Sequence, residues 1–224
     1  MKIALLICAA ALSVRAESLA DILGRMDKAA RDFKNMTASV KNIEYTDVLH
    51  ESAETSGSVR LKRSKNGLAA IMEFGEPNPY MVHLIGRKVE IFKPKAGPTG
   101  TVEEYDAGKL AKNMDQFLLL GFGTTGAELK KEYTIALGDA ATIDGVPTTR
   151  IDLYPKSAEL KKLVTKVELW IPASSGNPVR EKVLQPSKDY RLVTYSNMKV
   201  NTDVPDSAFE LNTPKGVRRM PAVK

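Results

Sequence analysis

Residues 57–94 constrain the fold most, because they place several apolar, β-rich runs between tight turns. Asn66-Gly67 is a strong signal for a two-residue β-hairpin, since both residue types tolerate the positive φ of a type I′ turn. Gly86-Arg87 indicates a second turn, and residues 76–79 a rigid break between the two. Strands joined by such short turns pair antiparallel, because parallel strands need long crossover connections. This stretch therefore predicts an antiparallel meander.

The first sixteen residues are typical of a secretory signal peptide. Lys2 precedes an apolar run at 3–12, and small residues before position 17 predict cleavage after Ala16. The run is shorter than the ~20 residues that span a bilayer, and Cys8 lies inside it, away from a lipidation position. We expect residues 17–224 to form one soluble periplasmic domain that has no cysteine, and hence no disulfide or thiolate metal site.

Composition excludes several function classes. Basic and acidic residues are interleaved, the net charge is only +6, and aromatic residues make up 6%, so nucleic-acid binding is not expected. His50 and His83 belong to no metal-ligand spacing, and the chain has no GxSxG motif. The sequence therefore predicts no catalytic residues, no metal, no cofactor and no enzymatic activity.

Outside the central stretch, periodicity predicts further strands, about ten in all, and two or three helices. Residues 18–35 have one apolar stripe and a Ser18–Asp21 capping box, which predicts a helix. Its polar face is mixed in sign, which favours a helix packed on the sheet over one lying on a membrane. A strand at 37–50 and a polar turn at 51–56 should follow it. Further expected features are strands at 102–105, 133–137, 148–154, 164–171, 178–184, 190–200 and 206–211, a helical turn at 128–133, an Asp144-Gly145 hairpin turn and a frayed basic tail at 216–224.

Residues 108–122 interrupt the strands with helical spacing. Two roles stay open for this segment: it fills the concave side of a curved sheet, or it forms a movable cover over an apolar cavity. The expected lid helix is carried by Leu110, Met114, Phe117, Leu118 and Phe122. The predicted fold is mainly β with α: a strongly curved antiparallel sheet that forms an unclosed, incomplete barrel with helices packed inside as a lid.

Arg63 is the unusual residue of the central stretch. It has the same period-2 register as Val59 and Leu61, so it belongs to the line of an apolar face. Either it is an ordinary surface arginine, or it lies at that face and needs carbonyl or carboxylate partners, because an unpaired buried charge is costly. In the second case it holds a helix lid shut through backbone carbonyls, or it meets the polar end of a lipid.

The chain resembles the periplasmic lipoprotein carrier family, LolA and its relatives, known as outer-membrane lipoprotein-sorting proteins. The order and spacing of several short motifs carry the resemblance, from the signal peptide to the closing strand. These motifs are Ser56-Gly57-Ser-Val-Arg-Leu-Lys-Arg63, Glu76-Pro77, Ile85-Gly86-Arg-Lys-Val-Glu-Ile-Phe92, Asp144-Gly145, Ile151-Asp-Leu-Tyr-Pro155-Lys156 and Phe209-Glu-Leu-Asn-Thr-Pro214-Lys-Gly216-Val217.

The resemblance implies an eleven-stranded unclosed barrel that encloses acyl chains beneath helices, with Arg63 as the arginine that holds the lid. It implies a monomeric carrier that takes an acylated lipoprotein, or a phospholipid, from an inner-membrane exporter to an outer-membrane acceptor. The residues expected to line the lipid cavity are Val59, Leu61, Met72, Phe74, Leu84, Ile91, Ile151, Leu153, Val167 and Leu169. A regulatory domain of the same fold that senses lipid or lipoprotein, and a hydrolase with a dispersed site, remain alternatives.

Overall fold

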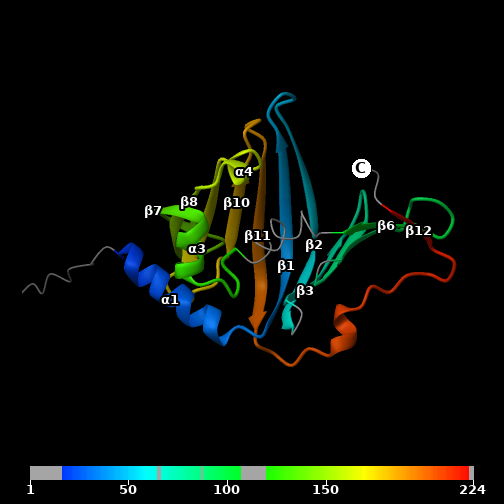
Figure 1. Cartoon of the computed structure of the whole chain (residues 1–224), viewed down its shortest axis with the longest axis horizontal. Coiled ribbons are helices and arrows are strands. Elements are labelled where there is room, and N and C mark those ends of the chain that lie inside the picture. Colours follow the sequence, from blue (N-terminus) through cyan, green and yellow to red (C-terminus); the bar gives the residue numbers. More distant parts are fainter. Residues whose placement is uncertain (1–16, 65–66, 87, 107–119, 222–224) are drawn as a thin grey trace, which may run out of the picture.

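The computed structural model describes residues 17–64, 67–86, 88–106 and 120–221, and these residues build one twelve-stranded sheet with a few short helices (Figure 1). The predicted signal peptide lies outside the described residues, as does most of the segment predicted to be a lid. No helix within these ranges is long and apolar enough to cross a membrane. The strand order is β12-β6-β5-β4-β3-β2-β1-β11-β10-β9-β8-β7.

The elements follow one another as a meander with helices between some strands. The helices are α1 (Leu19–Asp32), α3 (Gly126–Glu132), α4 (Ala158–Lys161) and the 3-10 helix η1 (Asp206–Phe209). The strands are β1 (Asn35–Thr46), β2 (Glu51–Ser64), β3 (Gly67–Phe74), β4 (Tyr80–Ile85), β5 (Lys88–Lys93), β6 (Thr101–Asp106), β7 (Tyr133–Ile143), β8 (Val146–Pro155), β9 (Lys166–Pro172), β10 (Arg180–Leu184), β11 (Tyr190–Val200) and β12 (Arg218–Pro221).

The sheet is open, with β12 and β7 as its two edges. All neighbouring strands pair antiparallel except β12, which runs parallel to β6. The prediction of a purely antiparallel sheet is therefore wrong at this edge. The reason is the long connection after β11, which carries the C-terminal segment past β2 and β3 to the far edge (Figure 1).

Turn chemistry predicted three hairpins, and two of the three turns lie at the predicted residues. Asp144 and Gly145 both have positive φ, 48° and 81°, and they join β7 to β8. Gly86 has a φ of 56° between β4 and β5. The β2–β3 hairpin forms as well, but Ser64 pairs with Gly67, so Gly67 belongs to β3 and the turn predicted at Asn66-Gly67 is wrong by one residue.

The helix α1 begins as its capping box predicts. The Ser18 hydroxyl accepts a hydrogen bond from the Asp21 backbone amide at 3.2 Å, and the Asp21 carboxylate accepts from the Ser18 amide at 3.2 Å. Its apolar stripe is buried, with Ile22 fully inaccessible to solvent. The stripe packs toward β8 and β9 beside α3, so α1 and α3 cover the β7 end of the sheet together (Figure 1).

The polar turn expected at 51–56 is wrong, because β2 already begins at Glu51. It pairs with β1 without interruption from Asn35–Lys62 to Thr46–Glu51. Polar and small side chains are acceptable there because much of this part of β2 is exposed, and an ion pair between Lys41 and Glu54 spans the two strands at 2.9 Å. The result is a long hairpin whose turn, residues 47–50, projects at the top of Figure 1.

The C-terminal predictions also need correction. The strand expected at 206–211 is instead the 3-10 helix η1, and the tail expected to fray forms β12. Phe209 explains the first difference, because it is buried against β2 and β3 with the Lys62 ammonium 4.5 Å from its ring centroid. The Arg60 Nε also donates to the Ala208 carbonyl at 2.9 Å. Tertiary contacts thus override the local strand pattern.

Candidate functional site

One face of the sheet carries the apolar residues of β1–β5, and α1 and α3 pack against this same face. We call it the inner face. Its first apolar cluster lies over β1–β5 and β11 and includes Phe33 and Phe122 from outside the sheet. The buried members of this first cluster are Phe33, Met36, Ala38, Val40, Val59, Leu61, Ala70, Val82, Leu84, Val89, Phe122 and Val193.

A second cluster lies at the β7 end of the same face, beneath α1 and α3. Its residues come from both helices, from the α4–β9 region and from β7–β9. Its buried members are Ile22, Leu23, Met26, Leu120, Leu129, Tyr133, Ile151, Leu153, Leu160, Val164, Val167, Leu169 and Ile171.

The ten residues expected to line a cavity divide between these two clusters. Val59, Leu61 and Leu84 are buried in the first cluster, with the half-buried Met72, Phe74 and Ile91 packed against it. By contrast, Ile151, Leu153, Val167 and Leu169 are fully buried in the second cluster, which α1 and α3 fill. The first cluster is therefore the better candidate for a binding surface. Leu110, Met114, Phe117 and Leu118 lie outside the described residues.

Arg63 lies at the rim of the first cluster and reaches the chain that follows the predicted lid. Its Nη2 donates a hydrogen bond to the Gly123 carbonyl at 2.9 Å. A Cβ at Gly123 would lie 2.8 Å from that nitrogen and 3.1 Å from Cδ1 of Phe33, and the φ of Gly123 is +70°. The arginine side chain is exposed, as the surface alternative expected, and it nevertheless has a backbone carbonyl partner.

The short segment 120–125 is packed tightly onto the inner face. Phe122 is fully buried and meets the Tyr195 ring edge-on, with centroids 5.2 Å apart. Thr125 caps α3 through a capping box, and the Asp27 carboxylate of α1 accepts from the Gly126 amide at 2.5 Å. The hydrogen bond from Arg63 to Gly123 therefore lies between the buried Phe122 and Thr125, the N-cap residue of α3.

Glu181 is a polar residue of the inner face that sequence reasoning missed. In β10 it lies between Leu169 of β9 and Val193 of β11 by register, and only 2% of it is exposed. Its Oε1 atom has no hydrogen-bond partner among the residues that the structure describes. Burial raises the pKa of Glu181 to about 8, although the Arg191 guanidinium lowers it in part. The carboxyl is therefore mainly protonated at neutral pH.

The signal for Glu181 was present in the sequence. The run Arg180-Glu-Lys looks like a solvated surface of alternating charge, and that interpretation is wrong for its middle residue. Glu181 has the same period-2 register as Val179 and Val183, so the three side chains share one face of the strand. The same register argument singled out Arg63.

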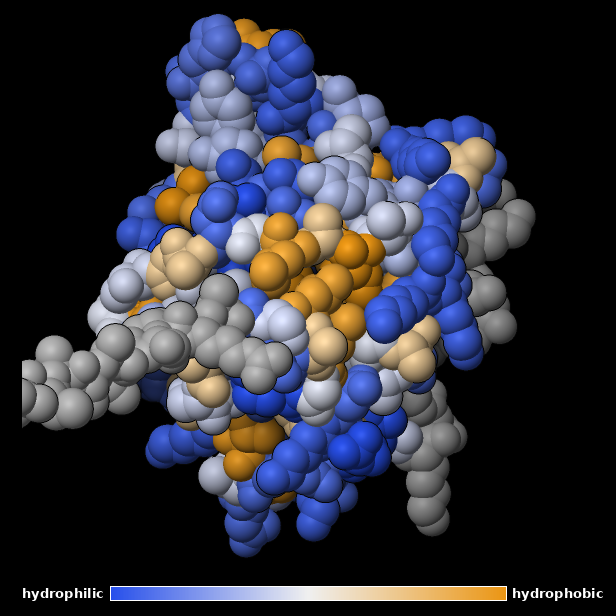
Figure 2. All heavy atoms as spheres, turned by 90° about the vertical axis from the view of Figure 1, so that its left-hand side faces the viewer, coloured by the Kyte–Doolittle hydropathy of each residue, from blue (hydrophilic) through white to orange (hydrophobic). Residues whose placement is uncertain are grey.

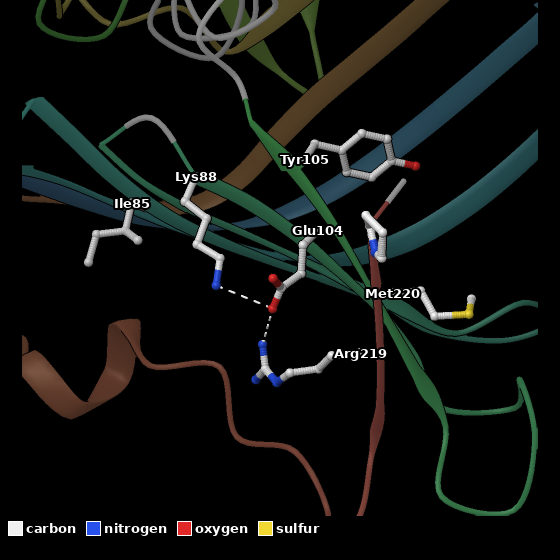
Figure 3. Close-up of a pocket in the computed structure, with 7 residues that line it drawn as sticks. Ile85, Lys88, Glu104, Tyr105, Arg219 and Met220 are labelled. Carbon is white, nitrogen blue, oxygen red and sulfur yellow. Dashed lines mark hydrogen bonds and ion pairs between the residues drawn. The ribbon is translucent and has the colours of Figure 1, made fainter. Parts of the chain in front are cut away.

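A separate hollow of about 600 Å³ lies where β12 joins β6 (Figure 3). It is lined by Ile85, Lys88, Glu104, Tyr105, Arg219, Met220 and Pro221. The Arg219 Nη1 and the Lys88 Nζ lie 2.6 and 3.3 Å from Glu104 Oε1, and the same two cations contact Glu90. These ion pairs hold β12 to the sheet edge.

Glu90 is the centre of that network. Burial alone would raise its pKa, but hydrogen bonds from Lys88, His83 and Arg219 outweigh burial and lower the pKa to about 2. The His83 Nδ1 lies 2.9 Å from Glu90 Oε2, so this histidine has a carboxylate partner. Within the described ranges, no group of three or more His, Cys, Asp or Glu side chains is placed to hold a metal ion.

The chain matches no protein-family model and no curated protein sequence. It is similar to several solved structures. MucB matches with 12% identity and a TM-score of 0.53 over 86% of this chain, which spans 62% of that protein's length. The Mycobacterium tuberculosis lipoprotein LppX matches with 17% identity and a TM-score of 0.52, over 84% of this chain and 99% of the other.

A LolA superfamily protein from Nitrosomonas europaea matches with 16% identity and a TM-score of 0.41, over 88% of this chain and 99% of the other. The likenesses to MucB and LppX show a shared fold at low sequence identity. This chain therefore shares the fold of MucB and LppX.

Proposed function

We propose that this chain is a periplasmic, non-enzymatic carrier that binds the acyl chains of a lipoprotein, or of a related lipid, against the first cluster of its inner face. It receives this cargo from an inner-membrane exporter and passes it to an outer-membrane acceptor. Residues 17–224 act as one domain and as a monomer in this proposal. The likeness to LppX and the motif resemblance to lipoprotein carriers support the ligand class.

The observation that carries the proposal is how the first cluster is covered. Phe122 packs into it from outside the sheet, and the next residue accepts an exposed hydrogen bond from Arg63. The second cluster, in contrast, is fixed by two helices. An acyl chain therefore enters most easily at Phe122, with Arg63 as the contact that gates it.

Magnitudes favour this arrangement. A hydrogen bond to a charged group contributes about 1.5–3 kcal/mol, and less where water competes at an exposed position. Burying an acyl chain yields about 0.8 kcal/mol for each CH₂ group, so ten methylenes supply roughly 8 kcal/mol. The ligand thus outweighs the contact that must open, while the closed empty form stays stable.

The first test is native mass spectrometry, with lipid extraction, of the mature protein purified from its own periplasm. A carrier should retain about one acylated molecule per chain. An empty protein that also takes up no lipidated peptide in vitro would contradict the proposal. An empty protein that instead forms a stable complex with another protein would favour the regulatory, lipid-sensing alternative.

The gating role of Arg63 needs a matched comparison on the same strand. Arg63→Leu should change the uptake and release rates of a fluorescent acylated peptide, because the bond to the Gly123 carbonyl is lost. Arg60→Leu is the control, since Arg60 lies on the opposite face and pairs with Glu73 and the Ala208 carbonyl. Equal rates for wild type and Arg63→Leu would refute the role of Arg63.

A further inference from the structure

Antiparallel register brings three connections to the same end of the sheet. Tyr45 of β1 pairs with Tyr190 of β11, Tyr190 pairs with Leu184 of β10, and Leu184 pairs with Lys166 of β9. The connections 47–50, 185–189 and 156–165, the last of which contains α4, therefore lie together. Figure 1 places this end at the top, with the tip of the β1–β2 hairpin rising furthest.

Two aliphatic side chains occupy that tip. Val48 is 82% exposed and Leu49 is 62% exposed, the highest values for large hydrophobic residues in the described part of the chain. Figure 2 shows hydrophobic residues among hydrophilic ones at the top of the molecule, where the tip lies. Single exposed aliphatics are common, but two adjacent ones on a projecting turn form an apolar point of contact.

Tyrosines and a lysine lie behind this tip in a defined order. The rings of Tyr45 and Tyr190 stack with centroids 4.9 Å apart, and the Lys182 ammonium lies 4.0 Å from the Tyr190 centroid. Tyr45 is three residues from Val48, which is at most about 10 Å of extended chain. From the tip inward, the order is aliphatic residues, then tyrosine, then lysine. This order matches a lipid bilayer from its acyl region out to its headgroups.

The tip is also fixed in place. The Asp47 backbone amide donates to Asp189 Oδ1 at 2.8 Å, and the Ser187 hydroxyl donates to Asp189 Oδ2 at 2.8 Å. The Tyr45 hydroxyl lies 3.2 Å from His50 Nδ1 across the turn. These contacts tie the hairpin tip to the neighbouring β10–β11 turn, so little ordering is needed when it makes contact.

The charged side chains at this end of the sheet indicate whether docking here would be driven by apolar or by electrostatic interactions. Five lysines and four carboxylates lie in and next to the three connections: Lys156, Lys161, Lys162, Lys166, Lys188, Asp47, Glu51, Glu159 and Asp189. Their formal charges sum to only +1, so this end offers little net attraction to anionic lipid. Binding through it must come from apolar insertion.

We propose that the β1–β2 hairpin tip inserts Val48 and Leu49 into the surface of a lipid bilayer, with Tyr45 and Tyr190 at the headgroup level. This docking surface is distinct from the first cluster, and it operates whether or not the protein carries a ligand. It positions the protein on a membrane while cargo enters or leaves.

Vesicle binding tests the proposal directly. The full mature chain should co-sediment with uncharged phosphatidylcholine vesicles, and the Val48→Ser/Leu49→Ser variant should bind roughly tenfold more weakly or worse, because both buried aliphatic groups are lost. Leu137→Ser/Val146→Ser is the matched control, since these exposed aliphatics lie on β7 and β8. The control should bind like wild type, and neither anionic lipid nor added salt should change the result much.

A label gives a second measurement that does not depend on affinity. The mature chain has no cysteine, so Leu49→Cys carries a single environment-sensitive fluorophore. Its emission should increase on vesicles, whereas a fluorophore at Val146→Cys should not respond. Absent vesicle binding, equal binding of both serine variants, or self-association that only the tip variant abolishes would overturn the proposal. Uptake of an acylated peptide, measured separately, reports on the carrier function.

Discussion

Replacing Glu181 by glutamine should make the protein more stable at alkaline pH. In the folded chain Glu181 is 2% exposed, and its Oε1 finds no hydrogen-bond partner within the described ranges of the chain. Burial raises its pKa from 4.5 to about 8, with Arg191 opposing the shift in part. The folded protein therefore holds a proton between these pH values that the unfolded chain releases.

The sign and size of the effect follow from linkage. Because the folded state binds more protons, the free energy of unfolding falls as pH rises through this window. The contribution is fully present below pH 4.5 and is lost by about pH 8. Each pKa unit corresponds to 1.36 kcal/mol, so the full difference amounts to about 5 kcal/mol. Glutamine keeps the shape of the protonated acid and does not titrate.

Urea unfolding followed by fluorescence of Trp170 at pH 5 and at pH 8 is the assay. The stability advantage of Glu181→Gln over wild type should be small at pH 5 and several kcal/mol at pH 8. Glu210→Gln, which makes the same chemical change on an exposed side chain, is the control. An equal difference at both pH values would refute the assignment of Glu181 as a buried, protonated acid.

Two further perturbations test the packing around the site and the sheet edge. Gly123→Ala should destabilise the fold by about 1 kcal/mol or more and weaken the Arg63 contact, because φ is +70° and a Cβ would meet the guanidinium; urea unfolding measures this, and wild-type stability would contradict it. Glu90→Gln should remove stability at pH 7 but much less near pH 2, since the pKa of Glu90 is lowered to about 2 and its ionised form is favoured only above that value; a pH series of thermal unfolding reveals it, and a loss that does not depend on pH would speak against the network.

Local chemistry predicted the elements that depend on few residues. Asp144-Gly145 and the Ser18 capping box fix a turn and a helix start through the conformations and hydrogen bonds of adjacent residues. The start of β2 at Glu51 and the strand β12 depend instead on partner strands far along the sequence. Nothing local in a polar run such as 51–56 announces that β1 continues beside it, so this part of the hairpin could not be predicted.

The candidate site could be predicted only in part, again because local patterns depend on few residues whereas packing depends on distant ones. Period-2 register alone places Arg63 on the line of Val59 and Leu61, and its carbonyl partner, Gly123, lies sixty residues away. Register also places Glu181 on an apolar line, but the flanking Arg180 and Lys182 suggested a solvated strand. Which of the two clusters the helices fill, however, depends on tertiary packing. From the sequence alone, the expected cavity residues separate only into those of the first half of the chain and those of the second half.

Arg63 and Glu181 together determine how apolar the inner face is at neutral pH. Arg63 keeps its charge at the rim, where it is exposed and bonded to a carbonyl, and Glu181 loses its charge inside, where its raised pKa keeps it protonated. Neither residue therefore places an unpaired charge against the first cluster, which an acyl chain could not tolerate. Above about pH 8 Glu181 ionises although its Oε1 has no hydrogen-bond partner among the described residues, so we expect acyl binding to weaken there together with stability, and to weaken less in Glu181→Gln.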